Sequence, residues 1–272
     1  MKTDLHIHTK YSDGEFDEFE IIERVHESGV QEFCICDHDT IKGSEKVFNL
    51  LKKENKYNLI FHSGVELSCR INDFHGGINL HILYRDFDYN NPKLQFFLDE
   101  INEKRMQKID VMIEHIYKNF GVKIEKQKVL ELFENTCVVG KPHMYKLLCE
   151  YGDFDREEYY SVMNSMKTQS LKLNLYEVLD SLKDEQGYFT LAHPIEIMEE
   201  YNLSYDDIDD LAKLLKFHGL KAMETKHSKI SKEQYEKFHE IAVKYDLIET
   251  CGSDYHGPSV KPDVMLGKCE KV

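Results

Sequence analysis

The chain has 272 residues and a formal net charge of −15, with 50 acidic residues against 35 basic ones. This length suffices for one α/β barrel or for a core domain with an insertion, and the charge argues against a protein that coats long duplex nucleic acid or an anionic membrane. Three features predict a reduced, soluble, cytoplasmic protein. The seven cysteines are scattered and form no Cys-x-x-Cys pair, the N-terminus has no apolar signal region, and no apolar run reaches ~18 residues.

The first predicted strand, residues 4–8, carries two histidines. Because side chains alternate along a strand, His6 and His8 project from the same face, about 6.6 Å apart, and can reach one metal ion. Asp13 follows just beyond the strand. A single His-x-His pair also arises by chance, so the metal hypothesis depends on what the rest of the chain offers.

The next elements repeat this pattern. A helix at 17–28, with Phe19, Ile22 and Val25 on its apolar face, precedes a strand at 32–36 that ends in Asp37-His38-Asp39. A second helix is predicted at 44–54, and a strand at 58–61 leads to Gly64-Val65-Glu66. Alternation from 67 to 87 around Gly76-Gly77 predicts a hairpin, and its returning arm, 78–84, carries His81.

Residues 91–170 change to long helical patterns rich in Lys and Glu, including 94–117 and 126–133, and predict a helical insertion. Within it, Gly140-Lys141-Pro142-His143 begins a helix, where free backbone N–H groups favour anions. The alternative is an ordinary helix start with Pro142 in the first turn. We expect a functional role for Lys141 and His143 because of the motifs elsewhere in the chain.

The C-terminal part returns to alternating elements. A helix at 175–185 leads to a strand at 187–192 that stops at His193, and a helix at 206–217 leads to a strand at 220–224 that ends at Glu224. His227 follows, but Lys226 and Ser228 beside it indicate an exposed loop. A helix at 231–245 and a strand at 247–251 complete the series, and the strand runs into Asp254 and His256.

Alternating strands and helices predict parallel βαβ units, in which functional groups collect at the carboxyl ends of the strands. Six histidines and three carboxylates would then share one small volume, which is costly without compensating cations. Mixed imidazole and carboxylate ligands suit Zn, Mn or Fe, and two or three divalent ions would attract an anion such as a phosphate ester. The chain has no P-loop, Gly-x-Ser-x-Gly elbow or dinucleotide fingerprint.

Taken in order, the motifs at Asp4–Thr9, Ser12–Gly14, Asp37–Asp39, Gly64–Glu66, Ala192–Pro194 and Gly252–Gly257 resemble those of the polymerase-and-histidinol-phosphatase (PHP) domain family. The resemblance implies an α/β fold, a distorted, TIM-like (β/α)7 barrel formed by residues 1–90 and 171–272, with residues 91–170 as the helical insertion. The insertion resembles that of small bacterial PHP phosphoesterases, in which arginine commonly stands at the position of Lys141.

The resemblance also implies two or three divalent ions (Mn, Zn or Fe) and their ligands. The first ion would be held by His6, His8, Glu66 and Asp254. Glu66 would also bind the second ion, together with His81 and His193. The third ion would be held by Asp13, His38 and His256. A water or hydroxide that bridges two ions would attack phosphorus. The implied catalytic residues are Asp254, His256, His193 and His227, and the implied phosphate contacts are Lys141, His143 and His227.

The sequence therefore predicts a metal-dependent phosphoesterase for a small phosphorylated substrate. Three substrate classes stay open: a nucleoside 3′,5′-bisphosphate, a short oligonucleotide cut by a 5′→3′ exonuclease, and a sugar phosphate or its cyclic ester. The alternatives from other classes are a non-catalytic, metal-stabilised PHP module and a regulatory protein that binds an anion. The sequence leaves the physiological metal and the oligomeric state open.

Overall fold

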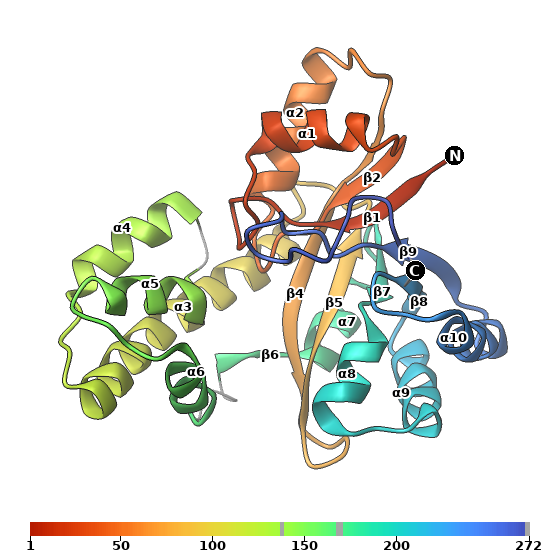
Figure 1. Cartoon of the computed structure of the whole chain (residues 1–272). Helices are drawn as coiled ribbons and strands as arrows, with labels where there is room; N and C mark the ends of the chain where they lie inside the picture. The colour runs from red at the N-terminus through yellow and green to blue at the C-terminus, as the bar shows by residue number, and fades with distance from the viewer. Residues whose placement is uncertain (137–138, 167–170, 270–272) are drawn as a thin grey trace.

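The computed structural model describes residues 1–136, 139–166 and 171–269 and has an α/β fold (Figure 1). Its strands are β1 (Thr3–Ile7), β2 (Glu32–Ile35), β3 (Ile60–His62), β4 (Gly64–Ile71), β5 (Ile78–Arg85), β6 (Leu173–Asn174), β7 (Tyr188–Leu191), β8 (Leu220–His227) and β9 (Ile248–Gly252). Its helices are α1 (Glu18–Glu27), α2 (Lys42–Lys53), α3 (Pro92–Phe120), α4 (Lys126–Thr136), α5 (Lys141–Cys149), α6 (Arg156–Asn164), α7 (Leu175–Leu182), α8 (Pro194–Tyr201), α9 (Tyr205–Phe217) and α10 (Lys232–Lys244).

The strands form two sheets whose edges meet. One sheet has the order β1-β2-β3 and the other β6-β4-β5-β7-β8-β9, and β5 runs antiparallel to both of its neighbours. The Asp39 N–H donates to the Glu66 carbonyl at 2.8 Å, which joins the end of β2 to β4. The Asp254 N–H donates to the His6 carbonyl at 2.9 Å, which joins the chain after β9 to β1. The strands therefore surround one interior, and the predicted distorted α/β barrel is confirmed.

The barrel interior is layered along its strands. On β5, His81, Leu83 and Arg85 share the inward face because successive side chains alternate. Leu83 packs with Cys34, Cys36 and Ala192 in a buried apolar layer. His81 lies one step above this layer and Arg85 one step below it. The apolar layer thus closes the barrel beneath the strand ends that carry the histidines.

Helix α3 connects the barrel to the other helices of the predicted insertion. Its first half contributes Leu94, Phe97 and Leu98 to the large core of the six-stranded sheet. Its second half contributes Ile109 and Met112 to a separate apolar cluster shared with α4–α6, which gather at the left in Figure 1. The boundaries 1–90, 91–170 and 171–272 stay a prediction, since α3 belongs to both cores.

Most predicted elements occur, with ends shifted by a few residues. Asp17 caps α1 and forms a capping box with Glu20. The apolar face predicted for this helix was wrong in one position: Phe19 is 60% exposed, whereas Ile21 is buried, because the buried stripe follows positions 18, 21, 22 and 25. Helices α6 and α8 and strand β6 were not predicted. Within the described ranges, no helix combines the length and the apolar character that crossing a bilayer requires.

Candidate metal centre

His6 and His8 lie at the end of β1 with both rings buried. Their Nε2 atoms are 3.0 Å apart and face the same two carboxylates. Glu66 Oε2 lies 3.4 Å from His6 Nε2 and 3.2 Å from His8 Nε2, and Asp254 Oδ1 lies 3.8 and 3.3 Å from the same two nitrogens. The structure therefore brings together the four residues expected around a first ion.

The other oxygen of Glu66 faces a second pair of histidines. Oε1 is 3.1 Å from His81 Nδ1 and 2.9 Å from His193 Nε2, and these two nitrogens are 3.4 Å from each other. Each oxygen of the Glu66 carboxylate thus points at one of the two predicted groups of ligands, as expected of a carboxylate that bridges two ions. His81, which no motif supported, joins this group because β5 pairs with β4 and β7.

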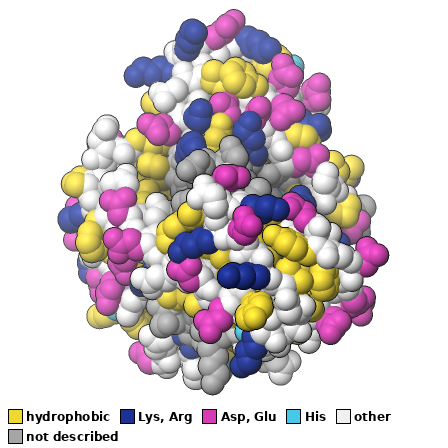
Figure 2. Space-filling model, turned by 90° about the vertical axis from the view of Figure 1, so that its left-hand side faces the viewer, with side chains coloured by type: hydrophobic (Ala, Val, Ile, Leu, Met, Phe, Trp, Pro, Cys, Tyr) yellow, Lys and Arg dark blue, Asp and Glu magenta, His cyan; other side chains and the backbone are white. Residues whose placement is uncertain are grey.

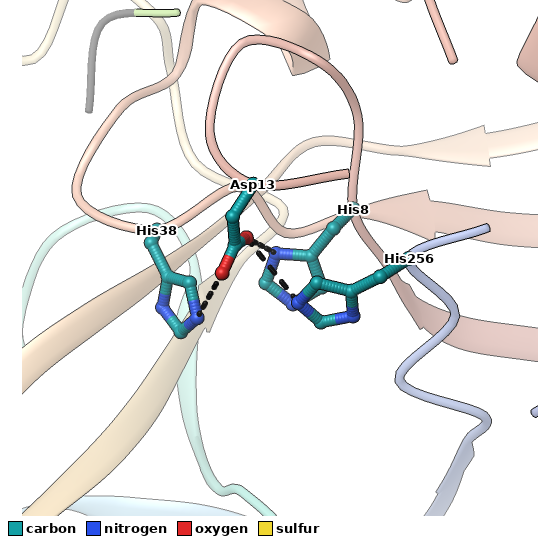
Figure 3. Close-up of side chains that lie close together, drawn as sticks. All are labelled: His8, Asp13, His38 and His256. Atoms are coloured by element: carbon teal, nitrogen blue, oxygen red, sulfur yellow. Dashed lines mark ion pairs between the residues drawn. The ribbon is translucent and has the colours of Figure 1, made fainter. Parts of the chain in front are cut away.

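Asp13 lies among the histidines of the third predicted group of ligands. Its Oδ1 is 3.2 Å from His256 Nε2 and 3.6 Å from His8 Nδ1, and its Oδ2 is 3.7 Å from His38 Nε2. Figure 3 shows the three rings converging on this carboxylate from β1, from the loop after β2 and from the loop after β9. His38 Nδ1 lies 2.9 Å from Glu66 Oε2, so this group is continuous with the other two.

The donor set fits divalent cations. Glu66 Oε2 is buried and makes no hydrogen bond, although three imidazole nitrogens lie within 3.4 Å of it. Asp13 Oδ1 and His38 Nδ1 are likewise buried without a hydrogen bond. Buried polar atoms left unpaired in this way are costly, and a cation among them would satisfy imidazole and carboxylate together. These ligand types favour Zn, Mn or Fe over Mg or Ca.

The electrostatics of the cluster are those of a dense, mutually charged site. Burial alone would raise the pKa of Glu66, but the surrounding histidines His38, His81 and His6 hold it well below its usual range. Burial lowers the pKa of His8, yet Asp254 and Glu66 outweigh this and raise it to about 9. Because a histidine binds a cation only through an unprotonated nitrogen, metal binding to this set would release protons and weaken in acid.

The sequence left open whether His227 faces the site, and the exposed loop that its neighbours indicate is not observed. His227 is the last residue of β8 and is fully buried. A register shift between Glu224 and Lys226, in the pairing of β8 with β9, changes the alternation and turns His227 inward. Its Nδ1 accepts the Lys229 N–H at 3.3 Å, which leaves Nε2 as the protonated nitrogen, 3.8 Å from Asp254 Oδ2.

The two candidates of the insertion take different places. Gly140 caps α5, and its N–H donates to His143 Nδ1 at 3.1 Å. Burial lowers the pKa of His143, and the negative charge of Asp13 opposes this. Lys141 donates to Asn164 Oδ1 at 2.6 Å and lines a neighbouring cavity of about 770 Å³.

This cavity is polar and mostly cationic. Its charged lining residues are Arg70, Lys141, Lys172 and Glu200. Asn79, also in the lining, stands two residues before His81 on β5, so these two residues share one face of the strand, about 7 Å apart.

Two further cations lie close to this cavity. Burial, followed by the positive charges of Lys172, Arg105 and Lys141, lowers the pKa of Lys108 to about 8. Arg105 forms an ion pair with the buried Asp39, next to His38. These cations, Arg105, Lys108 and Lys172, were not predicted as site residues, because charged segments of this kind are usually solvated. The packing of α3 against the barrel places Arg105 and Lys108 here, and Lys172 directly precedes β6, which pairs with β4.

Comparison with known proteins finds a matching family model and several similar sequences. A family model described as "PHP domain" matches residues 4–248. A 5′-3′ exoribonuclease of Haemophilus influenzae is 26% identical over 270 residues, which cover 94% of this chain and 90% of the relative. A phosphoribosyl 1,2-cyclic phosphate 1,2-diphosphodiesterase of Eggerthella lenta is 26% identical, with 94% and 95% covered. A 3′,5′-nucleoside bisphosphate phosphatase of Chromobacterium violaceum is 22% identical, with 94% and 87% covered.

Two solved structures share the fold. One, from Bifidobacterium adolescentis, has a TM-score of 0.78 and 24% identity, with 99% of this chain and 92% of that chain covered. The other, an amidohydrolase from Chromobacterium violaceum, has a TM-score of 0.78 and 21% identity, with 100% and 94% covered.

Proposed function

The chain belongs to the PHP domain family, and from this membership we propose that it is a metal-dependent phosphoesterase for a small substrate that carries a second phosphate group. The observation that supports the second phosphate is the cavity beside the metal centre. It is lined by Arg70, Lys141 and Lys172 against one carboxylate, Glu200. A substrate with two phosphates would place the scissile one at the metal ligands and the other among these cations.

Each group of residues then has a distinct task. The nine ligands His6, His8, Asp13, His38, Glu66, His81, His193, Asp254 and His256 would hold two or three ions. Bound divalent ions would supply Lewis-acid chemistry, lowering the pKa of a coordinated water toward ~7 and polarising the phosphoryl oxygens. His227 Nε2–H, next to Asp254, would donate a hydrogen bond to the phosphate, and His143 would contact the phosphate from the insertion.

A nucleoside 3′,5′-bisphosphate is the substrate class that we favour, and the name of the Chromobacterium violaceum relative supports it. The second candidate is a 5′→3′ exonuclease for short oligonucleotides, since relatives from Haemophilus influenzae and Escherichia coli are named 5′-3′ exoribonucleases. Figure 2 shows Lys, Arg, Asp and Glu side chains intermixed on the face of the predicted insertion. Such a surface offers no continuous basic track for a long duplex.

The test is Mn²⁺-dependent phosphate release from a panel of nucleoside 3′,5′-bisphosphates, a 5′-phosphorylated trinucleotide, sugar phosphates and a cyclic sugar phosphate, with products identified by mass. Bisphosphates should be the best substrates. His8→Ala or Asp254→Ala should abolish turnover while the protein stays folded, because each removes a metal ligand. Faster cleavage of the trinucleotide would favour the exonuclease. No release from any substrate with Mn²⁺, Zn²⁺ or Fe²⁺ would overturn the proposed function.

A further inference from the structure

Glu224 lies outside the nine expected ligands, yet it contacts two of them. It belongs to β8 and is 0% exposed. Its Oε1 is 3.0 Å from His6 Nδ1, and its Oε2 accepts the backbone N–H of His193 at 2.7 Å. One buried carboxylate therefore connects the ligand at the end of β1 with the ligand that follows β7.

The contact with His6 determines which nitrogen of that ring can bind a cation. A carboxylate accepts hydrogen bonds, so the proton of the neutral His6 ring resides on Nδ1, where Glu224 accepts it. Nε2 is then unprotonated, and it is Nε2 that faces Glu66 and Asp254. The opposite tautomer would direct an N–H at the ions and prevent binding.

The contact with His193 stabilises an unusual backbone conformation. His193 has a φ of 27°, in the left-handed region that few residues other than glycine adopt. It stands at the turn between β7 and α8, and this conformation directs its Nε2 toward Glu66, 2.9 Å away. The hydrogen bond from its N–H to Glu224 holds the turn in place.

Close packing around Glu224 requires glycine at position 252. A Cβ atom added to Gly252 would overlap both Glu224 Oε1 and the Cβ of His6. Because φ of Gly252 is not in the left-handed region, this glycine is needed for space and not for its backbone conformation. Strands β1, β8 and β9 therefore meet at the pair formed by His6 and Glu224.

We propose that Glu224 is a positioning residue of the metal centre, which holds His6 in the tautomer that binds metal and fixes the strained turn of His193. This inference rests on the proposed metal-dependent function. Outer carboxylates of this kind typically change metal affinity about 10- to 100-fold. Glu224 itself touches neither the substrate nor the reacting atoms.

The test is Glu224→Gln, which keeps the shape but offers one acceptor oxygen instead of two. Either the His6 ring or the His193 N–H then meets an amide NH₂. We expect the Kd for Mn²⁺, measured by calorimetry on metal-free protein, to rise about 10- to 100-fold. At a pH at which the His6 ring is neutral, we also expect the ¹⁵N shifts of the metal-free variant to show His6 changing toward the Nε2–H tautomer, which a merely structural role would not produce.

Glu249→Gln is a matched control, because Glu249 makes the same kind of pair with His239 Nδ1, at 2.8 Å, on the surface. It should leave Mn²⁺ binding unchanged. Unchanged Mn²⁺ affinity and an unchanged His6 tautomer in Glu224→Gln would overturn the role of Glu224. If Glu224→Gln does not fold, Glu224→Asp is the alternative variant, because it keeps the charge on a shorter side chain. Glu224→Asp should weaken Mn²⁺ binding, and an unchanged Mn²⁺ affinity would overturn the proposal. Failure of the unmodified protein to bind Mn²⁺ would instead overturn the metal centre itself.

Discussion

His62 lies near the end of the barrel opposite the metal centre, between two carboxylates. Its Nδ1 is 2.7 Å from Asp86 Oδ1, and its Nε2 is 2.9 Å from Glu32 Oε1. The hydrogen bond with Asp86, helped by Glu32 and opposed by burial, raises the pKa of His62 to about 9. The folded state therefore binds this proton more tightly than the unfolded chain does.

A raised pKa stabilises the fold only where the group is protonated. The contribution of His62 should be complete below its ordinary pKa of about 6.5 and should be lost as the pH rises through about 9. We predict that His62→Gln lowers the free energy of unfolding in urea at about pH 6 and has a much smaller effect at about pH 10. Asp86→Asn should reduce the same pH dependence. An equal effect of His62→Gln at both pH values would contradict the raised pKa of His62.

Lys141 lines the cavity from the insertion. If that cavity holds a second phosphate, Lys141→Ala should raise KM several-fold and leave kcat nearly unchanged, because binding is lost equally from the ground state and the transition state. Lys126→Ala is the control, since Lys126 pairs with Asp110 on the exposed surface at 2.6 Å. The measurement is steady-state kinetics of both variants on the best substrate. An unchanged KM for Lys141→Ala would show that Lys141 does not bind the substrate.

At the scale of elements, α3 is tied to the rim of the metal centre by one buried ion pair. Arg105 pairs with Asp39, which is 1% exposed, follows His38 directly and also accepts the Ser68 N–H at 2.6 Å. Burial raises the pKa of Asp39, but the Arg105 and Lys172 charges outweigh this and lower it. The carboxylate therefore stays ionised, and the helix supplies its counter-charge.

Arg105→Leu should leave the buried carboxylate of Asp39 without its main partner. Breaking a buried pair in this way typically costs about 3–5 kcal/mol, whereas exposed pairs contribute about 0–1 kcal/mol. We therefore expect a loss of about 3 kcal/mol in the free energy of unfolding, measured with urea, and a change below about 1 kcal/mol for the exposed Lys126→Met. Similar small losses in both variants would show that Asp39 finds another partner.

For the whole molecule, the nine expected ligands come from β1, β4, β5 and the segments that follow β1, β2, β7 and β9. Ions bound to all of them would hold the two sheets together. A ligand that binds only the folded state at 100 times its Kd stabilises it by about 2.7 kcal/mol. We predict that Mn²⁺ raises the Tm of EDTA-treated protein by several degrees and that Mg²⁺ raises it less, because Mg²⁺ prefers oxygen ligands. Equal Tm values with and without Mn²⁺ would contradict a metal centre that joins the sheets.

The sequence predicted those parts of the fold and site that depend on local regularity. His6 and His8 follow from two-residue alternation, and the pattern of ligands at strand ends follows from the alternation of strands with helices. His227 could not be placed, because a register shift in the β8–β9 pairing turns it inward. Arg105 reaches the centre only through the packing of α3 on the barrel, which leaves no periodic signal in the sequence.

The division of α3 between two apolar cores has a consequence for how this protein can change during evolution. Side chains such as Phe97 pack with the barrel, and side chains such as Met112 pack with α4–α6. A substitution in the second core can therefore reshape the cavity wall that carries Lys141 without repacking the strands behind the metal ligands. The cavity wall and the metal ligands can therefore change at separate rates.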